Sequence, residues 1–174
     1  TNSDTEVLIN SYNFWGKKCF KYFDGMWAVA IYDFKKKSTI LSRDYVGQKP
    51  LFYNSNKDML SFSSQINGIF QIKSNFEFSK KNTLEYFKFN HYPAPLTGYK
   101  NIFQVSPGEI LEFRNMRINK KFFWRIENGG NYNIFFKKNN YESTKKLFFK
   151  IVRNFAIADE KVGLCLSSGL DSQL

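Results

Sequence analysis

The last residues of the chain have the types and the spacing of a phosphate-binding loop. An apolar stretch, residues 162–166, runs directly into Ser-Ser-Gly-Leu-Asp-Ser at residues 167–172. Small residues let backbone amides converge on an anion, and a helix that begins there adds its positive end. Ser167 and Ser172 can donate hydroxyl hydrogen bonds to phosphate oxygens, whereas Asp171 would reach a Mg²⁺ ion that bridges the phosphates. The pattern therefore predicts a site for the phosphates of a nucleotide.

The same six residues also fit an ordinary strand-to-helix turn, and the pattern by itself does not decide between the two. It differs from the P-loop of kinases and GTPases, which ends in Gly-Lys-Ser or Gly-Lys-Thr. The phosphate site is favoured by the apolar strand predicted over residues 162–166 and by an amphipathic helix predicted before it. That helix covers residues 141–157, and its apolar positions recur at helical spacing: Leu147, Phe148, Ile151, Val152 and Phe155.

Upstream, the pattern predicts helices and hairpins of a mixed fold. A short helix is expected over residues 5–12, with Ser3 or Asp4 as its N-cap. The expected strands form hairpins at 26–32 with 38–43, 51–53 with 59–63, and 109–113 with 118–124, and a further short helix is expected at 83–89. The first hairpin is predicted to be buried, and the second to extend the same sheet.

The chain is predicted to contain parts of two domains. Asn128-Gly129-Gly130-Asn131 and the polar residues that follow are rich in turn formers, so residues 128–140 are the expected linker. Residues 1–127 would then belong to one domain and residues 141–174 to the start of another. The first residue is not Met and the chain stops after the serine-glycine loop, so both ends are expected to be cuts in a longer chain.

Composition argues against a membrane protein and gives little support to nucleic acid as a partner. Apolar residues make up 43% of the 174, but no apolar run approaches the ~20 residues that span a bilayer. The formal net charge of +11 could attract phosphate backbones, yet it is mostly Lys spread along the chain. A solvated basic surface is therefore favoured over a nucleic-acid site. The first residues show no secretory signal.

The cysteines and the single histidine exclude several kinds of site. Cys19 and Cys165 stand far apart, so neither a disulfide framework nor a zinc site is supported, and a reducing cytoplasm is expected. Cys19 follows two lysines but has no nearby base, and it is interpreted as inert. With His91 as the only histidine, Ser-His-Asp chemistry is nearly excluded.

Three charged residues, Arg43, Asp44 and Lys49, allow two interpretations. They could be catalytic. A strand-end Arg-Asp pair more commonly holds a loop by charge-assisted hydrogen bonds, and that structural interpretation is favoured.

These motifs, in this order, resemble the glutamine-hydrolysing asparagine synthetase family over essentially the whole chain. The similar segments are Ser3-Asp4-Thr5-Glu6-Val7-Leu8, Gly25-Met26-Trp27-Ala28-Val29-Ala30-Ile31-Tyr32-Asp33, Ser42-Arg43-Asp44 with Gly47-Gln48-Lys49-Pro50-Leu51-Phe52-Tyr53, Pro107-Gly108, and Val162-Gly163 through Ser172. The sequence departs from the family at Ser168, which replaces a Gly, at Gln65, which replaces a Glu, and at Lys161, which replaces a Pro.

The resemblance implies a fold of two parts. Residues 1–127 would be the C-terminal part of an N-terminal nucleophile amidotransferase sandwich with αββα layers, in the α+β class. Residues 141–174 would be the first helix, strand and loop of a Rossmann-like α/β adenine nucleotide alpha-hydrolase domain. The family's nucleophilic Cys stands at the mature N-terminus and would lie upstream of residue 1, so no catalytic residue is expected in this chain.

The resemblance also implies two sets of binding residues. Asp4 would bind the α-amino group of glutamine, unless it is simply a helix N-cap. In the second site Leu166 would contact the adenine nucleotide and Asp171 would reach Mg²⁺. The residues that would hold the pyrophosphate of ATP are Ser167, Ser168, Gly169, Asp171 and Ser172.

The implied reaction is the ATP-dependent amidation of aspartate to asparagine through β-aspartyl-AMP, with ammonia from glutamine. ATP and Mg²⁺ would be required, the small-molecule partners would be glutamine, aspartate and ATP, and the full-length protein could be a homodimer. One alternative keeps the fold but changes the acceptor to a sugar or a peptide carboxylate. Another, less favoured, is a basic binding module without chemistry.

Overall fold

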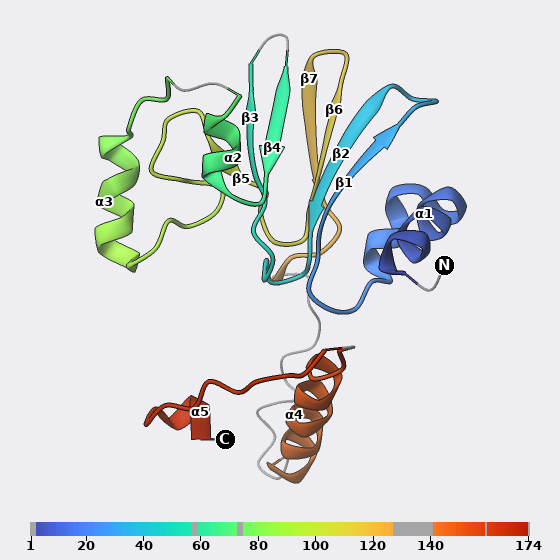
Figure 1. Cartoon of the computed structure of the whole chain (residues 1–174), viewed down its shortest axis with the longest axis vertical. Helices are drawn as coiled ribbons and strands as arrows, with labels where there is room; N and C mark the ends of the chain where they lie inside the picture. The colour runs from blue at the N-terminus through green and yellow to red at the C-terminus, as the bar shows by residue number, and fades with distance from the viewer. Residues whose placement is uncertain (1–2, 57–58, 73–74, 127–140, 159, 174) are drawn as a thin grey trace. The chain divides into compact units, whose positions relative to one another are not determined.

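A computed structural model describes residues 3–56, 59–72, 75–126, 141–158 and 160–173 (Figure 1). Contacts divide the chain into two compact units, Thr1–Gly129 and Gly130–Leu174. The linker predicted at residues 128–140 lies outside the described residues. Among the helices that the structure does describe, none has both the length and the apolar character that a membrane span requires.

The first unit begins with helix α1 (Asp4–Trp15), which continues into the 3₁₀ helix η1 (Gly16–Lys21). Ser3 has an extended backbone, and its Oγ accepts a hydrogen bond from the Glu6 amide at 3.4 Å. Ser3 therefore caps the helix and satisfies one of the amide donors that a helix start leaves free. The helix begins one residue earlier than predicted and runs three residues longer.

The larger sheet consists of β1 (Ala28–Asp33), β2 (Ser38–Arg43), β6 (Glu109–Arg114) and β7 (Arg117–Phe122). They lie in the order β1-β2-β6-β7, and every pair is antiparallel. Both predicted hairpins in this sheet are present. The first is buried along β2 only, because β1 is an edge strand whose side chains are half-buried or exposed.

The second predicted hairpin does not extend this sheet, and that prediction is wrong. Strands β3 (Phe52–Ser55) and β4 (Leu60–Ser63) pair as expected, but with β5 (Phe103–Gln104) they form a separate sheet in the order β4-β3-β5. In the larger sheet β2 pairs with β1 on one side and with β6, from much later in the chain, on the other, so β3 does not pair with the strand that it follows. Local patterns show that two strands pair, but they do not show which sheet the pair joins.

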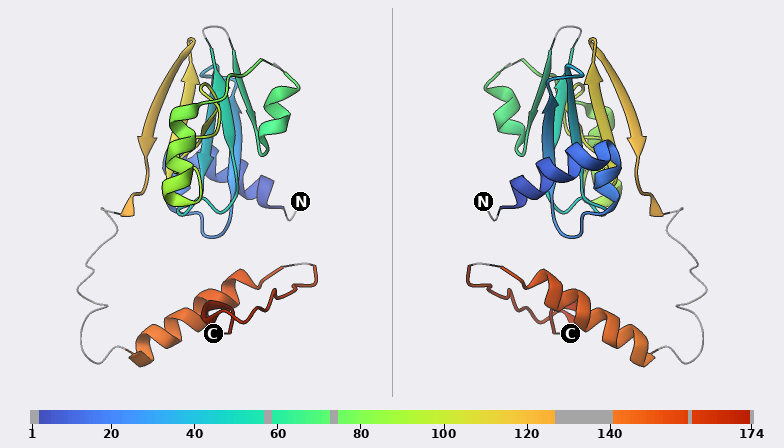
Figure 2. Two further views of the ribbon diagram at one scale, coloured as in Figure 1. Left: turned by 90° about the vertical axis from the view of Figure 1, so that its left-hand side faces the viewer. Right: turned by 90° about the vertical axis from the view of Figure 1, so that its right-hand side faces the viewer.

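Two helices lie between β4 and β5 in the chain. Helix α2 (Ile66–Phe70) was not predicted from the sequence, and it contacts β3 and β4. Helix α3 (Lys80–Phe89) begins three residues before the predicted start, because Ser79 caps it through a 3.2 Å hydrogen bond from the Asn82 amide. Figures 1 and 2 show α2 and α3 on one outer side of the two sheets and α1 on the opposite side.

Alternation along the central strands builds two apolar cores. Leu41 and Leu111 face the smaller sheet and pack with Tyr53 and other residues of the first core. Their neighbours Ile40 and Ile110 point to the opposite face and form a second core beneath α1 and η1. Successive side chains of a strand point to opposite faces, so a strand with two buried faces reads as a continuous apolar run. The result is an αββα arrangement of layers.

The second unit contains α4 (Tyr141–Phe155), close to its predicted range, and the short helix α5 (Leu170–Gln173). The strand predicted at residues 162–166 is absent from the structure. A strand is defined by its ladder with a neighbour, and no partner strand for these residues lies in the described part of this unit. Their apolar side chains are accordingly exposed, Leu164 at 82%.

The turn before β6 yields a stability prediction. Gly108 has φ +66°, and an added Cβ would lie 2.5 Å from the carbonyl oxygen of Trp124. We expect Gly108→Ala to lower the free energy of unfolding by about 1–3 kcal/mol, because the backbone must move or remain strained. Urea unfolding measures this. The control is Gly163→Ala, whose Cβ would meet nothing within 4 Å, and equal stability of the two variants would refute the prediction.

Candidate functional site

Asp4 lies in the first turn of α1 with an exposed side chain. The simple interpretation of Asp4 as the N-cap is wrong, because Ser3 occupies that position and makes the capping hydrogen bond. Within the described residues no group binds the Asp4 carboxylate. A negative charge there also interacts favourably with the positive end of the helix. Among the described residues the carboxylate is therefore exposed and without a partner.

The serine-glycine loop brings three of its predicted residues together. The hydroxyl oxygens of Ser167 and Ser172 lie 2.8 Å apart, and the Gly169 amide donates to Ser167 Oγ at 3.2 Å. A Cβ at residue 169 would lie 3.3 Å from Ser167 Oγ, so glycine permits this close approach. Two hydroxyl groups and a small residue therefore converge at the start of α5.

The other predicted residues of this loop do not join the cluster. Ser168 is exposed, and Leu166 is 70% exposed. The side chain of Asp171 lies outside the described residues, so its predicted contact with Mg²⁺ stays a prediction. The described residues contain no group of three or more His, Cys, Asp or Glu side chains that could hold a metal ion.

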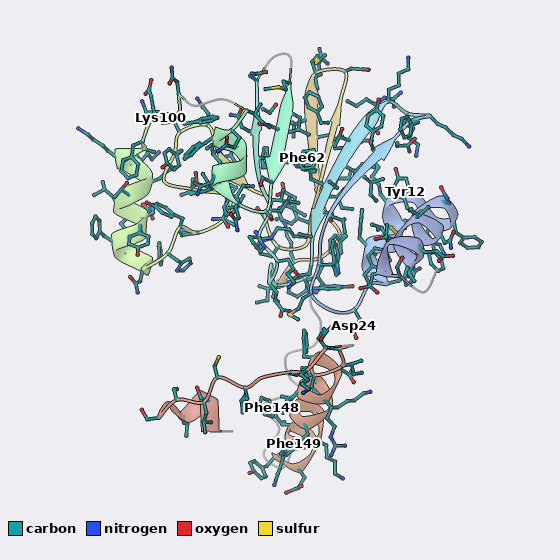
Figure 3. The ribbon with its side chains drawn as sticks, in the orientation of Figure 1. Tyr12, Asp24, Phe62, Lys100, Phe148 and Phe149 are labelled. Carbon is teal, nitrogen blue, oxygen red and sulfur yellow. The ribbon has the colours of Figure 1, made fainter. Side chains whose placement is uncertain are left out.

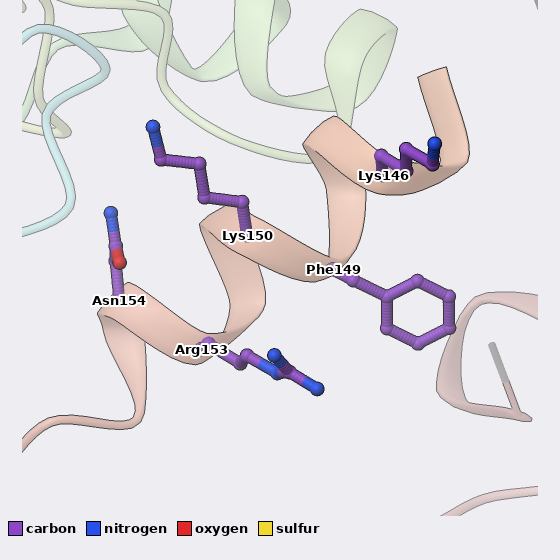
Figure 4. A pocket seen from close by; sticks show the side chains of 5 residues that line it. All are labelled: Lys146, Phe149, Lys150, Arg153 and Asn154. Carbon is purple, nitrogen blue, oxygen red and sulfur yellow. The ribbon is translucent and has the colours of Figure 1, made fainter. Parts of the chain in front are cut away.

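A shallow hollow on α4 is basic but comes from one helix alone. Its lining consists of Lys146, Phe149, Lys150, Arg153 and Asn154 (Figure 4). Figure 3 labels Phe148 and Phe149 on the same helix. Because no second element contributes to the hollow, it lacks the converging polar groups of a ligand site.

Arg43 binds backbone carbonyl groups of two loops. Its side chain is buried, and Nε and Nη1 donate to the carbonyl oxygens of Lys49 and Val105, both at 2.7 Å. Nη2 donates to the Gly47 carbonyl. Burial lowers the pKa of the Arg43 guanidinium, and the neighbouring charge of Asp44 opposes that shift. The guanidinium fork therefore ties the loop after β2 to the segment before β6.

Asp44 complements this arrangement by accepting from backbone amides. Oδ1 accepts from the Val46 and Gln48 amides at 3.2 and 2.9 Å, and Oδ2 accepts from the Trp27 and Lys49 amides, both at 3.2 Å. Asp44 is 1% exposed. Lys49 contributes its backbone, while its side chain is exposed. The structural interpretation is confirmed for the side chains of Arg43 and Asp44, whereas Lys49 contributes its backbone.

This network generates a second prediction. We expect Arg43→Lys to destabilise the protein by about 2–3 kcal/mol, because an ammonium group cannot reproduce the planar fork that reaches three carbonyl groups. Arg114→Lys is the matched control, since Arg114 is exposed and none of the described residues binds its side chain. Thermal or urea unfolding compares the two. A similarly small effect of both changes would contradict the structural role of Arg43.

The sequence did not predict a polar cluster in which Lys120, itself exposed, reaches the buried residues Glu109 and Tyr53. Glu109 is 1% exposed; it accepts from the Ser106 amide at 2.7 Å and lies 3.6 Å from Lys120 Nζ. Lys120 also donates to the Tyr53 hydroxyl at 2.6 Å. Burial lowers the pKa of Lys120, but Tyr53 and Glu109 outweigh it and the net shift is upward. No local motif signals these residues, because they come from three different strands.

The β1–β2 turn holds a second carboxylate with several donors. Asp33 Oδ1 accepts from the Lys36 amide at 3.0 Å, and Oδ2 lies 3.1 Å from Lys36 Nζ and 3.0 Å from the Tyr12 hydroxyl. The Lys36 amide, the Lys36 side chain and then Tyr12 favour the charged form, and they lower the pKa of Asp33 to about 2. Asp33 is thus an anion throughout the physiological range.

The lowered pKa of Asp33 predicts a pH dependence of stability. The folded pKa of about 2 lies below the ordinary value of 3.8, so the contribution is complete above about pH 4 and is lost as the pH falls towards 2. We expect Asp33→Asn to reduce the slope of unfolding free energy against pH in that window. Urea unfolding at several pH values measures it, and an unchanged slope would contradict the prediction.

The remaining residues singled out in the sequence, Cys19, His91 and Gln65, do not form a site together. Cys19 is fully buried, and burial raises the pKa of its thiol, as expected for an inert core residue. His91 is exposed, and its Nδ1 lies 2.8 Å from the Phe89 carbonyl oxygen. Gln65 is the N-cap residue of α2, but its side chain makes no capping hydrogen bond.

Comparison with known proteins first defines a class. Residues 1–124 match the family model of the glutamine amidotransferase domain. The first unit is therefore a glutamine amidotransferase domain. This match, together with the two packed antiparallel sheets, confirms the predicted sandwich.

Relatives that match nearly the whole chain identify its family among the glutamine amidotransferases. The putative glutamine-hydrolysing asparagine synthetase 2 of Methanocaldococcus jannaschii is 36% identical over 180 residues, covering 99% of this chain and 34% of the relative. The glutamine-hydrolysing asparagine synthetase 3 of Bacillus subtilis is 30% identical over 174 residues, covering 98% and 28%. The chain belongs to the glutamine-hydrolysing asparagine synthetase family, as predicted. It spans about a third of the length of these relatives.

Two further proteins are similar at lower identity. Amidase chry2 of Gibberella zeae is 24% identical over 174 residues, covering 98% of this chain and 26% of that protein. A solved structure of glutamine phosphoribosylpyrophosphate amidotransferase from B. subtilis, complexed with ADP and GMP, aligns with a TM-score of 0.49 and 20% identity over 71% of this chain and 23% of its own. The relatives thus include a protein that is not named a synthetase.

Proposed function

We propose that the chain is part of a glutamine-dependent asparagine synthetase. The observation that carries the proposal is the extent of the similarity, since the two synthetases match at least 98% of this chain. The match therefore includes both the amidotransferase domain and the serine-glycine loop. A protein that only hydrolysed glutamine would share the first unit alone.

On the glutamine side, Asp4 would bind the α-amino group of the substrate. Its carboxylate is exposed at the start of α1 and has no partner among the described residues. An ammonium group there would make a charge-assisted hydrogen bond. The nucleophile that attacks the glutamine amide would be the N-terminal Cys that the family resemblance implies upstream.

On the ATP side, the loop fits a pyrophosphate group. The hydroxyls of Ser167 and Ser172 converge within 2.8 Å of each other, and Gly169 leaves room for a ligand to approach the backbone. Leu166 would contact the adenine nucleotide, and Ser168 would add a contact with the pyrophosphate. Asp171 would bind Mg²⁺, which neutralises phosphate charge when it is bound.

The proposed reaction has two steps. The β-carboxylate of aspartate attacks the α-phosphorus of ATP, so that pyrophosphate leaves and β-aspartyl-AMP forms. Ammonia from glutamine then displaces AMP and gives asparagine, with loss of a proton. In this scheme the chain's own loop holds the leaving pyrophosphate, and Asp4 holds the glutamine that supplies ammonia.

The second candidate function is an amidotransferase that amidates a carboxylate other than aspartate. Amidase chry2 matches 98% of this chain but has a different name from the synthetases. The fold and the loop would be the same for a sugar or a peptide carboxylate. The two candidates therefore differ only in which carboxylate supports pyrophosphate release.

The two sites predict separable defects in the full-length protein. We expect Ser167→Ala to lower aspartate-dependent pyrophosphate release about tenfold or more with either glutamine or ammonia, since a hydrogen bond to a charged group is lost. Glutamine hydrolysis should persist. Asp4→Ala should instead impair the glutamine-dependent reaction and leave the ammonia-dependent one intact. Ser64→Ala, at an exposed serine of the first unit, is the matched control.

The outcomes separate the candidates. Pyrophosphate release coupled to asparagine formation supports the synthetase, whereas release only with another carboxylate supports the second candidate. Absence of pyrophosphate release with every carboxylate, from a folded full-length protein supplied with ATP and Mg²⁺, would overturn both.

A further inference from the structure

Helix α1 has few apolar contacts to hold it against the sheet. None of its residues is buried. Leu8 and Tyr12 are its contributions to the core beneath it, where they pack at the edge of Cys19, Phe20, Ile40 and Ile110. Because little apolar area fixes the helix, polar contacts must contribute to its exact position on the sheet.

The first polar contact joins α1 to the end of β1. Tyr12 donates its hydroxyl hydrogen to Asp33 Oδ2 at 3.0 Å, and Figure 3 shows Tyr12 on the side of α1 that faces β1 and β2. Lys36 holds Asp33 through its amide and its side chain, and its Nζ lies 5.6 Å from the centre of the Tyr12 ring. Burial and Asp33 raise the pKa of Tyr12, so the hydroxyl remains a donor at neutral pH.

The second polar contact joins η1, the direct continuation of α1, to a different strand. Lys17 Nζ lies 2.6 Å from Glu112 Oε2 on β6, and the Glu112 side chain is 17% exposed. A partly buried ion pair is screened less than a surface pair. Contacts to two separate strands resist both sliding and rotation of the helix.

Asp4 depends on these contacts for its position, because nothing in the described part of the chain anchors its side chain. No described residue binds its carboxylate, so its position follows from the position of the helix. Asp4 and Tyr12 are eight residues apart on one helix, a rise of about 12 Å. A rigid helix of this length converts a small rotation at Tyr12 into a displacement at Asp4.

We propose that Tyr12, through its hydrogen bond to Asp33, is a positioning residue for glutamine binding. The inference rests on the proposed function, in which Asp4 binds the α-amino group of glutamine. Tyr12 does not touch the substrate. It sets the register of α1 on the sheet, and Lys17 with Glu112 supports the same register from η1, just beyond the C-terminal end of the helix.

The test is steady-state kinetics of the full-length protein with Tyr12→Phe. This change removes the hydroxyl but keeps the ring in the core, so the fold should be retained. We expect the KM for glutamine to rise about three- to tenfold, as for the loss of one hydrogen bond. The kcat with saturating glutamine and the rate with ammonia should stay unchanged, because the synthetase site is not involved.

Tyr32→Phe is the matched control. Tyr32 lies on β1, next to Asp33, and is 52% exposed, with no described partner for its hydroxyl. The same chemical change there should leave the KM for glutamine as in the wild type. Lys17→Met breaks the second contact independently and should raise the KM for glutamine in the same direction. Asp4→Ala sets the upper limit of the effect.

Three results would overturn the inference. Equal KM values for glutamine in Tyr12→Phe and Tyr32→Phe would show that the hydrogen bond does not position the site. If Tyr12→Phe lowers the ammonia-dependent rate as much as the glutamine-dependent rate, the effect would be general destabilisation. If the wild-type protein has no glutamine-dependent activity, or if Asp4→Ala leaves the KM for glutamine unchanged, the glutamine part of the proposed function fails, and this inference fails with it.

Discussion

Strand β2 ends in two buried charged side chains, and backbone groups of the surrounding loops satisfy both. Arg43 donates to carbonyl groups and Asp44 accepts from amide groups. Burying such charges without hydrogen bonds would cost several kcal/mol each. These hydrogen bonds hold the loop between β2 and β3, after which β3 pairs in the second sheet. Next to this network, the two sheets pack around a core that includes Leu41, Tyr53 and Leu111.

The two faces of the larger sheet make different kinds of contact. One face packs against the smaller sheet and is dominated by buried aliphatic side chains. The other carries α1, which has no buried residue and is held by Tyr12 and by the neighbouring Lys17. In the proposed function, a helix held by a few polar contacts would present Asp4 to glutamine, while the apolar core supplies the stability.

The two units differ in how far their apolar side chains are buried. Within its described residues, the first unit has two apolar cores and two antiparallel sheets. The second has one amphipathic helix whose apolar residues, such as Phe148 and Ile151, are 44% and 45% exposed. Its serine-glycine loop is nevertheless compact, because local hydrogen bonds among Ser167, Gly169 and Ser172 form it without support from a sheet.

Local patterns in the sequence determined the hairpins, the amphipathic helix α4, the loop at residues 167–172 and membership of the family, because alternation, helical spacing and small-residue motifs act over a few residues. They also identified Arg43 and Asp44 as loop-holding residues. The sequence could not show that β3 and β4 join a separate sheet, that residues 162–166 form no strand, or that Glu109, Lys120 and Tyr53 meet. Those outcomes depend on which strand edges are free and on contacts between residues far apart in the chain, and only the tertiary structure decides them.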